Sequence, residues 1–260
     1  MIVARSVRVS RSQFEIEGRR SDSARAKGRV TLTRADVVNA GARLLDSEGV
    51  EGISMRKLAK ALDTGAATLY WHVQDKDELL LAILDDTLGD VSFPEDGGWD
   101  ERLTKAMISC HDALLPRPAL IDVLWGAAWE LGPETLRIAD ELIGLVAETG
   151  LPEDEVADAY FALITLLFGF VAGEGSSPGN PSYSEIKAQA GSDNDQPAEA
   201  SEKYPNLVRY GPGATHEAME RRFRYALERF IEGIRARVDE QAKAPAGKPR
   251  RRGAKRKAAA

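Results

Sequence analysis

The chain of 260 residues is poor in the side chains that most often build disulfides and metal sites. Its single cysteine, Cys110, excludes an intrachain disulfide and fits a reducing compartment, so we expect a cytoplasmic protein. With only three histidines, the sequence predicts no multi-histidine metal site. No secretory signal is visible, and the longest apolar run, residues 159–172, is shorter than the roughly 20 residues that span a bilayer. We therefore expect no membrane segment.

The sequence also lacks the usual marks of an enzyme. It contains no glycine-rich phosphate loop and no nucleophile elbow. The adjacent residues Cys110, His111 and Asp112 point in different directions on a helix, so they do not form a catalytic set by themselves. We predict no catalytic residues, no metal and no cofactor.

The net charge of −6 conceals an uneven distribution of charged side chains. Residues 1–30 carry eight basic and three acidic side chains, and residues 243–260 carry eight basic and no acidic ones. The chain between them holds 19 basic and 38 acidic side chains. These basic segments either attract DNA through its phosphates or are disordered tails that only increase solubility, and the sequence leaves both roles open. We predict a disordered basic arm over 1–30 and a disordered basic tail over 241–260.

Residues 54–73 have the pattern of two short helices joined by a tight turn. Ser54 is placed to cap the first helix, and apolar residues recur at helical spacing as far as Leu62. Residues 63–65 interrupt this pattern, and we expect Gly65 to adopt the positive φ of the turn. The second helix opens with two alanines, which are too small to obstruct base edges, and continues with polar residues. The pattern predicts a helix-turn-helix.

This segment, and above all the run TLYWHV at residues 68–73, resembles the tetracycline-repressor (TetR) family of transcriptional regulators. The resemblance is strong over about residues 31–88 and persists beyond them only as a helical pattern. It implies an all-α homodimer with an N-terminal three-helix DNA-binding head and a larger helical domain that binds an effector and dimerises. Ala66 and Ala67 stand where the tetracycline repressor has larger base-reading residues, so its operator sequence does not carry over.

The resemblance also implies a set of DNA contacts. Arg56 matches a position that reaches a base edge, where a guanidinium is able to bind guanine through two hydrogen bonds; a phosphate contact or a plain surface charge is the alternative. Leu69 and Val73 are expected to pack inside the head, and Trp71 is expected as a wedge between the head helices. The predicted DNA-binding residues are Arg56, Ala66, Ala67, Thr68, Tyr70, His72 and Lys76.

Capping residues predict where the other helices of the head begin and end. Thr33 and Asp36 have the spacing of a capping box, and Asp75 with Glu78 repeats that signal before a connecting helix. Gly49 suits a left-handed C-cap. These signals predict helices that start after Thr33 and after Asp75.

The rest of the chain divides at Phe93-Pro94-Glu95-Asp96-Gly97-Gly98, a clear break in helical periodicity. We predict a helix-turn-helix domain with its connecting helix over 31–92 and an effector-binding and dimerisation domain over 93–240. A flexible loop is predicted at 174–213, followed by a last helix over about 215–238. The helix that opens at Pro152 is apolar on most of its surface, so part of it is expected to meet a second subunit.

An effector pocket is predicted among the apolar and aromatic residues of the larger domain, where ligands tend to bind between helices. Ordinary packing is the alternative for each of these residues. No set of side chains matches the coordination of magnesium–tetracycline, so tetracycline is not expected as the effector. The candidates are His111, Trp125, Trp129, Phe161 and Phe168.

The sequence thus predicts a cytoplasmic, ligand-responsive DNA-binding transcriptional regulator. Its expected partners are a double-stranded palindromic operator, an unknown small-molecule effector and a second copy of the chain. A repressor that the effector releases from the operator is favoured. The alternative is a transcriptional activator or a non-specific nucleoid-associated protein that uses the basic tails.

Overall fold

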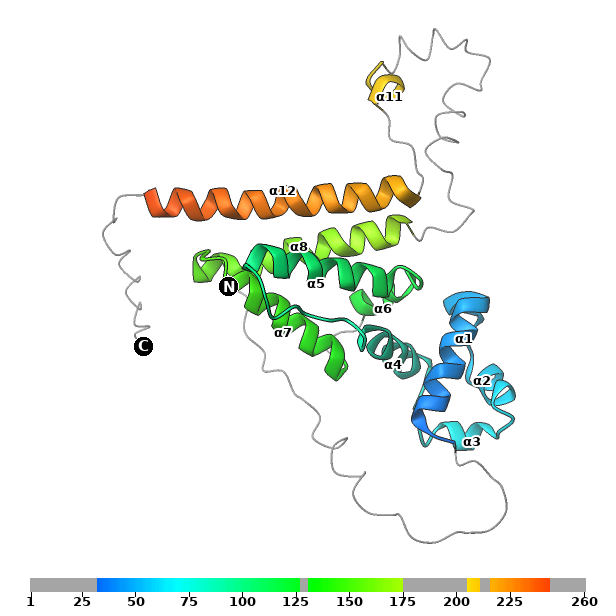
Figure 1. Ribbon diagram of the computed structural model, residues 1–260. Coiled ribbons are helices and arrows are strands. Elements are labelled where there is room, and N and C mark those ends of the chain that lie inside the picture. Colours follow the sequence, from blue (N-terminus) through cyan, green and yellow to red (C-terminus); the bar gives the residue numbers. More distant parts are fainter. Residues whose placement is uncertain (1–31, 127–130, 175–204, 211–215, 244–260) are drawn as a thin grey trace, which may run out of the picture. The chain divides into compact units, whose positions relative to one another are not determined.

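The computed structural model describes residues 32–126, 131–174, 205–210 and 216–243, and the regular elements in these ranges are all helices (Figure 1). The predicted all-α fold is confirmed. The described residues form two compact units. The first comprises the described residues up to Asp90 together with Pro116–Arg137, and the second comprises Val91–Leu115 and the described residues from Ile138 onward.

The first unit begins with α1 (Arg34–Gly52), which has the predicted capping box. The Thr33 hydroxyl accepts a hydrogen bond from the Asp36 amide at 3.2 Å, and the Asp36 carboxylate accepts one from the Thr33 amide at 2.9 Å. The Thr33 hydroxyl also donates a hydrogen bond to the Asp36 carboxylate at 2.6 Å, and this bond, together with the one from the Thr33 amide, holds the pKa of the Asp36 carboxyl below its usual range. Gly49 has a positive φ of 69° but a ψ of 179°, so it forms a kink within α1 and is not the predicted left-handed C-cap; the helix continues to Gly52.

The turn of the helix-turn-helix is built differently from the prediction. Helix α2 (Met55–Ala61) starts at Ser54, whose hydroxyl accepts a hydrogen bond from the Lys57 amide at 3.3 Å. The left-handed residue after α2 is Asp63, with φ of 48°, whereas Gly65 has an ordinary φ of −80°. Asp63 terminates α2 because the amide after it reaches back to the Ala59 carbonyl at 3.0 Å, as in a Schellman cap. The expectation for Gly65 was therefore wrong.

Helix α4 (Lys76–Leu88) packs on α1 and supplies much of the core of the first unit. Its cap is the predicted one, since the Asp75 carboxylate accepts a hydrogen bond from the Glu78 amide at 2.8 Å. Gly41 permits the close approach of α1 to α4, because a Cβ there would lie 2.9 Å from a methyl group of Leu79. The buried residues of α4 are Leu79, Leu80, Ile83, Leu84 and Leu88.

Two further helices start within the first unit. Helix α6 (Leu120–Gly126) packs against α4. Helix α7 (Pro133–Ala147) begins at a proline in this unit and continues into the second. We predicted an effector-binding and dimerisation domain over 93–240; the described residues of Pro116–Arg137, which lie within those bounds, belong to the first compact unit.

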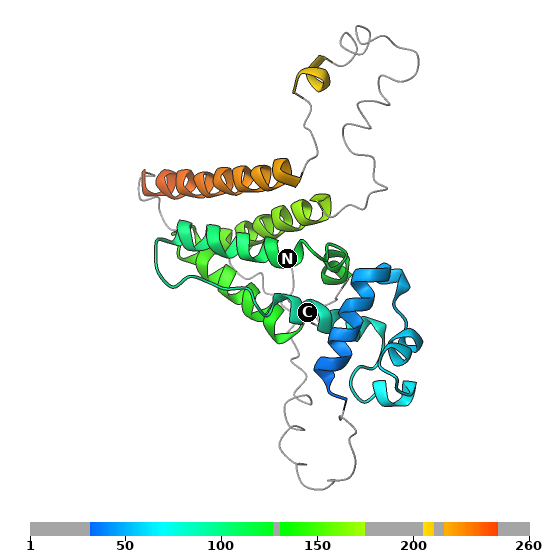
Figure 2. The same ribbon diagram turned by 45° about the vertical axis from the view of Figure 1, so that its right-hand side comes forward.

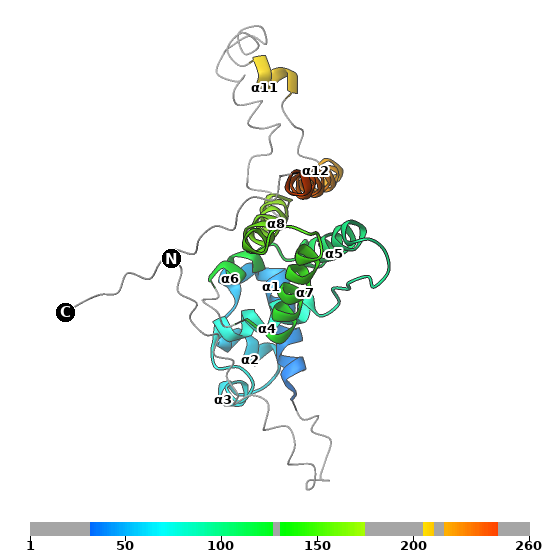
Figure 3. The ribbon, with the colours of Figure 1, turned by 90° about the vertical axis from the view of Figure 1, so that its left-hand side faces the viewer.

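In the second unit, α5 (Trp99–Leu114), α8 (Glu153–Glu174) and α12 (His216–Lys243) lie together, and Figures 2 and 3 show α12 beside α8. Cys110 on α5 is 1% exposed and lies in the core of this unit. Helix α12 extends past the predicted end near residue 238 and enters the segment assigned to the tail. The core of this unit includes Leu103, Met107, Leu163, Phe223 and Leu227.

Only part of the segments predicted to be disordered lies within the residues that the structure describes. Helix α11 (Pro205–Tyr210) lies within the predicted flexible loop at 174–213, so that part of the loop is helical. The basic arm, most of the basic tail and the rest of the loop fall outside the described residues.

Helix α8 is far less covered by its own chain than a core helix would be. By length and composition it is the one helix in the described ranges able to cross a membrane, with a mean hydropathy of 1.9 and only 17% of that window buried. One such helix is weak support for a membrane segment, because interface and core helices pass the same test. Its buried residues are Leu163, Leu167, Phe168 and Val171.

Candidate DNA interface and effector-binding residues

The second helix of the helix-turn-helix, α3 (Ala66–Leu69), presents its polar and small residues to solvent. Ala66, Ala67 and Thr68 are exposed, whereas Leu69 is 0% exposed and anchors the helix in the core of the head. Val73, 1% exposed, provides a second anchor just beyond the helix. The predicted packing roles of Leu69 and Val73 are confirmed.

The helix ends earlier than its sequence indicated, so Tyr70 and His72 lie on the turn that follows it. The Leu69 carbonyl accepts hydrogen bonds from the His72 amide at 2.8 Å and the Val73 amide at 3.0 Å, which closes this turn. Tyr70 is 54% exposed and His72 is partly buried. Both side chains therefore belong to the surface that continues from α3.

Trp71 is 86% exposed, so the expectation that it is wedged between the head helices was wrong. The cause is local: once the chain leaves α3, Leu69 and Val73 fill the interior and the indole between them faces solvent. The exposed indole adds a large flat surface next to Tyr70. Trp71 was not among the predicted DNA contacts, although it lies within the TLYWHV run that carries the resemblance.

The other predicted contacts come from the helices on either side of α3. Arg56 on α2 is exposed, and among the described residues no ion pair involves its guanidinium. Its neighbour Lys57, in contrast, forms an ion pair with Glu48 of α1. Lys76, partly buried, is the first residue of α4. Arg56 thus keeps its five donors available to a ligand.

The turn after α3 is fixed to the rest of the head by Glu78. One oxygen of its carboxylate accepts a hydrogen bond from the Gln74 amide at 2.7 Å, and the other pairs with Arg34 of α1 at 3.2 Å. These contacts join the start of α1, the turn and the start of α4. The solvent-facing side chains within residues 66–72 are therefore carried on a framework that orients them.

The structure does not gather the predicted effector-binding residues around one described cavity. His111 is 2% exposed; its ring stacks on Phe223 with centroids 4.4 Å apart, and its Nε2 lies 3.2 Å from a Glu174 carboxylate oxygen. Phe168 is also buried in the second unit. Phe161 on α8 is 55% exposed and Trp125 on α6 is 51% exposed. Trp129 lies outside the described residues.

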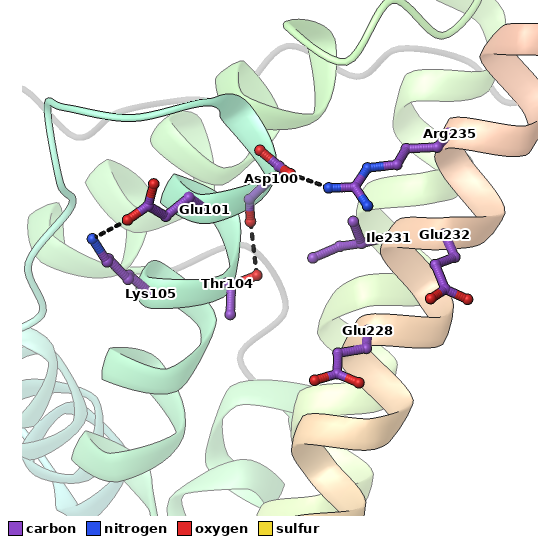
Figure 4. Close-up of a pocket in the computed structure, with 8 residues that line it drawn as sticks. All are labelled: Asp100, Glu101, Thr104, Lys105, Glu228, Ile231, Glu232 and Arg235. Atoms are coloured by element: carbon purple, nitrogen blue, oxygen red, sulfur yellow. Dashed lines mark hydrogen bonds and ion pairs between the residues drawn. The ribbon is translucent and has the colours of Figure 1, made fainter.

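Two grooves of the second unit have clear linings. The first, of about 330 Å³, runs between α5 and α12, and six of its eight lining residues are charged (Figure 4). Lys105 pairs with Glu101 at 2.7 Å, and Arg235 pairs with Asp100. The eight residues are Asp100, Glu101, Thr104, Lys105, Glu228, Ile231, Glu232 and Arg235.

The second groove, of about 510 Å³, lies between α8 and α12, and its lining includes the apolar residues Leu151, Phe230 and Ile234. An ion pair between Glu155 and Arg237 lies at this groove, and its hydrogen bonds lower the pKa of the Glu155 carboxyl. Among the described residues no group of three or more His, Cys, Asp or Glu side chains is placed to hold a metal ion.

The framework of α1 to α4 defines a helix-turn-helix DNA-binding head, joined here to a second helical unit. Residues 37–83 match the family model of bacterial regulatory proteins of the tetR family. Residues 93–238 match the model of the tetracyclin repressor-like C-terminal domain. The chain belongs to the TetR family of transcriptional regulators, and the resemblance found in its sequence is confirmed.

Relatives come from several actinobacteria. A helix-turn-helix transcriptional regulator of Saccharopolyspora erythraea is 33% identical over 55% of this chain and 61% of the relative. The transcriptional repressor DrrR1 of Streptomyces coeruleorubidus is 36% identical over 56% of this chain and 54% of the relative. The chain thus matches between about half and three fifths of the length of these curated relatives.

A solved structure matches over more of the chain. Apo ActR from Streptomyces coelicolor is similar with a TM-score of 0.68 and 29% identity, over 82% of this chain and 100% of ActR. ActR in complex with (S)-DNPA is similar with a TM-score of 0.65 and 29% identity, over 80% of this chain and 99% of that chain.

Proposed function

We propose that this chain is a cytoplasmic, ligand-responsive repressor that a small-molecule effector releases from a palindromic DNA operator. The observation that carries the proposal is the solvent-facing side of residues 66–72, held on the buried side chains of Leu69 and Val73 within a helix-turn-helix. The relative DrrR1, named a repressor, supports the direction of regulation. ActR, solved with a small molecule bound, supports a response to a ligand.

At the operator, the major groove receives α3 together with the start of α2. Arg56 supplies the hydrogen bonds to a base edge, and Ala66, Ala67 and the Thr68 methyl group make apolar contacts. Tyr70, His72 and Lys76 contact phosphates, which fix the register of the head on the duplex. Trp71 joins this group because its exposed indole extends the same surface.

The head has almost no net charge to provide non-specific attraction. Residues 31–75 contain five basic and six acidic side chains. The affinity of this head for DNA therefore depends on placed contacts more than on long-range attraction. That balance favours a specific operator over general coating of DNA.

A palindromic operator requires two heads, and we propose that α8 and α12 form the dimer interface. Phe161, exposed on α8, and the apolar residues Phe230 and Ile234 that line the groove between α8 and α12 provide a surface that a second copy would cover. In helix-turn-helix dimers the two recognition elements lie about 34–36 Å apart, one turn of DNA. A second copy related by two-fold symmetry is the simplest way to meet that spacing.

The effector acts through that spacing. A ligand that binds better to a conformation in which the two heads no longer fit successive major grooves weakens operator binding. A coupling of about 1–3 kcal/mol is sufficient for a useful switch. His111, Trp125, Trp129, Phe161 and Phe168 remain the proposed effector-binding residues, and the wholly buried ring of His111 would serve by orienting its neighbours.

The proposal is tested by DNA binding at near-physiological salt. The purified chain is offered a random duplex pool and its own upstream region, each in competition with unrelated DNA. Enrichment of a palindrome with a large specificity ratio supports the regulator. Equal binding to all DNA contradicts a specific operator and points to an architectural protein that uses its basic tails. No binding at all contradicts the proposed function.

A further inference from the structure

One segment of the chain lies in a different unit from its neighbours in sequence. Pro116–Arg137 packs with the head, whereas the residues on both sides of it belong to the second unit. Any movement of the second unit that shifts the end of α5 or the body of α7 is therefore transmitted covalently to this segment. Whether the DNA-reading surface moves with this segment depends on the contacts between the segment and the helices of the head.

Arg117 provides the fastening at the start of the segment. Its guanidinium donates two hydrogen bonds to the Asp46 carboxylate near the end of α1, at 2.7 and 3.0 Å. It donates a third to the Thr87 hydroxyl in the last turn of α4, at 3.0 Å. The paired Asp46 raises the pKa of Arg117, and Arg117 in turn lowers the pKa of Asp46. Two parallel bonds fix the plane of the guanidinium as well as its position.

The same residue sets the start of α6. The Arg117 carbonyl accepts a hydrogen bond from the Leu120 amide at 3.0 Å. The first turn of α6 is therefore hydrogen-bonded to the residue whose side chain binds α1 and α4. Pro116 and Pro118 flank it, and their rings restrict the backbone on both sides. A side chain held by α1 and α4 is thus joined through a stiff tripeptide to the first turn of α6.

A second contact fastens the other end of the segment. The Asp85 carboxylate of α4 accepts hydrogen bonds from the Thr135 amide at 2.9 Å and the Thr135 hydroxyl at 3.2 Å. It thereby caps the first turn of α7, where Gly132 has no side chain to do so. The absence of a side chain at Gly132 is required, because a Cβ there would lie 2.4 Å from that carboxylate. Both ends of the segment are therefore held by polar contacts to head helices.

We infer that Arg117 is the positioning residue that couples the ligand-binding part of the chain to the DNA-reading head, through its joint hold on α1, α4 and the start of α6. The link to α1 matters most, because Arg34 of α1 pairs with Glu78 of α4, and Glu78 in turn binds the backbone of the turn after α3. This inference rests on the proposed function.

Coupling between two parts of a protein is reciprocal, so it is measurable without knowing the effector. The DNA selected from the random pool is added to the full chain, and hydrogen exchange is followed in Leu120–Gly126. In the wild type, DNA bound at the head is expected to slow exchange in α6 by at least about fivefold, the lower end of typical couplings. Arg117→Gln is expected to bind the same DNA with little or no slowing in α6.

A matched control separates coupling from loss of an ion pair. Arg102 is as well buried as Arg117, at 25% against 24% side-chain exposure, and pairs with Glu148 at 2.7 Å within the second unit. Arg102→Gln should leave the DNA-dependent slowing intact. Asp46→Asn should reproduce the effect of Arg117→Gln, and the double variant should add nothing further.

The outcomes keep the two proposals apart. DNA binding without a response of α6 in the wild type, or an unchanged response in Arg117→Gln, overturns the coupling while the proposed function stands. If the wild type selects no DNA, the proposed function fails. The inference is then judged in the free chain, where Arg117→Gln must speed exchange in α6 and the end of α1 together. Unchanged exchange in either segment overturns it.

Discussion

Replacing Arg56 by alanine removes the one guanidinium that the head offers at the start of α2. The side chain is exposed, and within the described residues it takes part in no ion pair, so the substitution deletes no interaction that stabilises the fold. The free energy of unfolding is expected to change by less than about 0.5 kcal/mol, as for other surface substitutions. Any loss of DNA affinity therefore reports the contact itself.

The size of that loss follows from the chemistry of the contact. A bidentate hydrogen bond from arginine to guanine discriminates against other bases by about 1–3 kcal/mol. A dimer makes the contact twice, which gives about 2–6 kcal/mol. At about 1.4 kcal/mol for each tenfold change, Arg56→Ala is expected to weaken binding to the selected palindrome by roughly 30-fold or more.

Fluorescence anisotropy with labelled duplexes at several salt concentrations tests this expectation. Arg43→Ala is the control, because Arg43 is exposed on α1 of the same unit and has no proposed contact with DNA. Wild-type affinity of Arg56→Ala for the palindrome would refute the reasoning. Equal weakening on specific and unrelated DNA, with a salt slope reduced by about one per protomer, would assign Arg56 to a phosphate instead of a base.

Three further expectations concern the interface, the dimer and acid stability. Trp71→Ala should weaken operator binding several-fold without lowering Tm, whereas Leu69→Ala should cost about 2–5 kcal/mol in urea unfolding; a large fall in Tm for Trp71→Ala would restore its structural role. Phe161→Glu should yield monomers in sedimentation, and an unchanged dimer would exclude the α8 face. Because Arg117 lowers the pKa of Asp46, the ionised carboxylate stabilises the fold above its unfolded pKa. The advantage over Asp46→Asn, up to about 1 kcal/mol, should hold above about pH 5 and decline as the pH falls through the lowered pKa of Asp46; a difference that stays constant on acidification would contradict it.

Sequence was a good guide to structure where the deciding interaction lies within one turn of helix. The caps at Thr33, Ser54 and Asp75 each satisfy an amide three residues further along, so residue type and spacing identify them. The buried positions of Leu69 and Val73 follow from the same local pattern. The all-α fold and the helix-turn-helix are therefore predictable from the sequence alone.

Sequence failed where a small local choice decides which way a residue faces. The left-handed position after α2 was assigned to Gly65 because glycine adopts it at least cost, but Asp63 also tolerates it and lies at the position that the end of α2 requires. Trp71 was expected to be a wedge between the head helices, whereas its indole is 86% exposed. The early end of α3 at Leu69 reversed that orientation, and no periodicity in the sequence marks that end.

Sequence gave no signal for contacts between distant residues. Arg117 and Asp46 are separated by 71 positions, and each alone reads as an ordinary surface charge. Such pairs join Pro116–Arg137 to the helices of the head unit. A division of the chain at breaks in helical periodicity cannot detect them, so it groups this segment with the residues next to it in sequence. For the same reason the grouping of the predicted effector-binding residues could not be decided from their types.

The surface of α8 links the chemistry of one chain to the symmetry of its proposed operator. Helix α8 has a mean hydropathy of 1.9, and only 17% of its apolar window is buried, so much apolar surface faces water. Covering that surface would stabilise the assembly by about 25 cal/mol for each square ångström of apolar area buried. A second copy that covers this face brings a second head under two-fold symmetry. A two-fold pair of heads is matched by a palindrome and not by a single half-site. The dimer and the palindrome are thus one proposal that rests on the apolar surface of α8, and a chain that stays monomeric at micromolar concentration would contradict both.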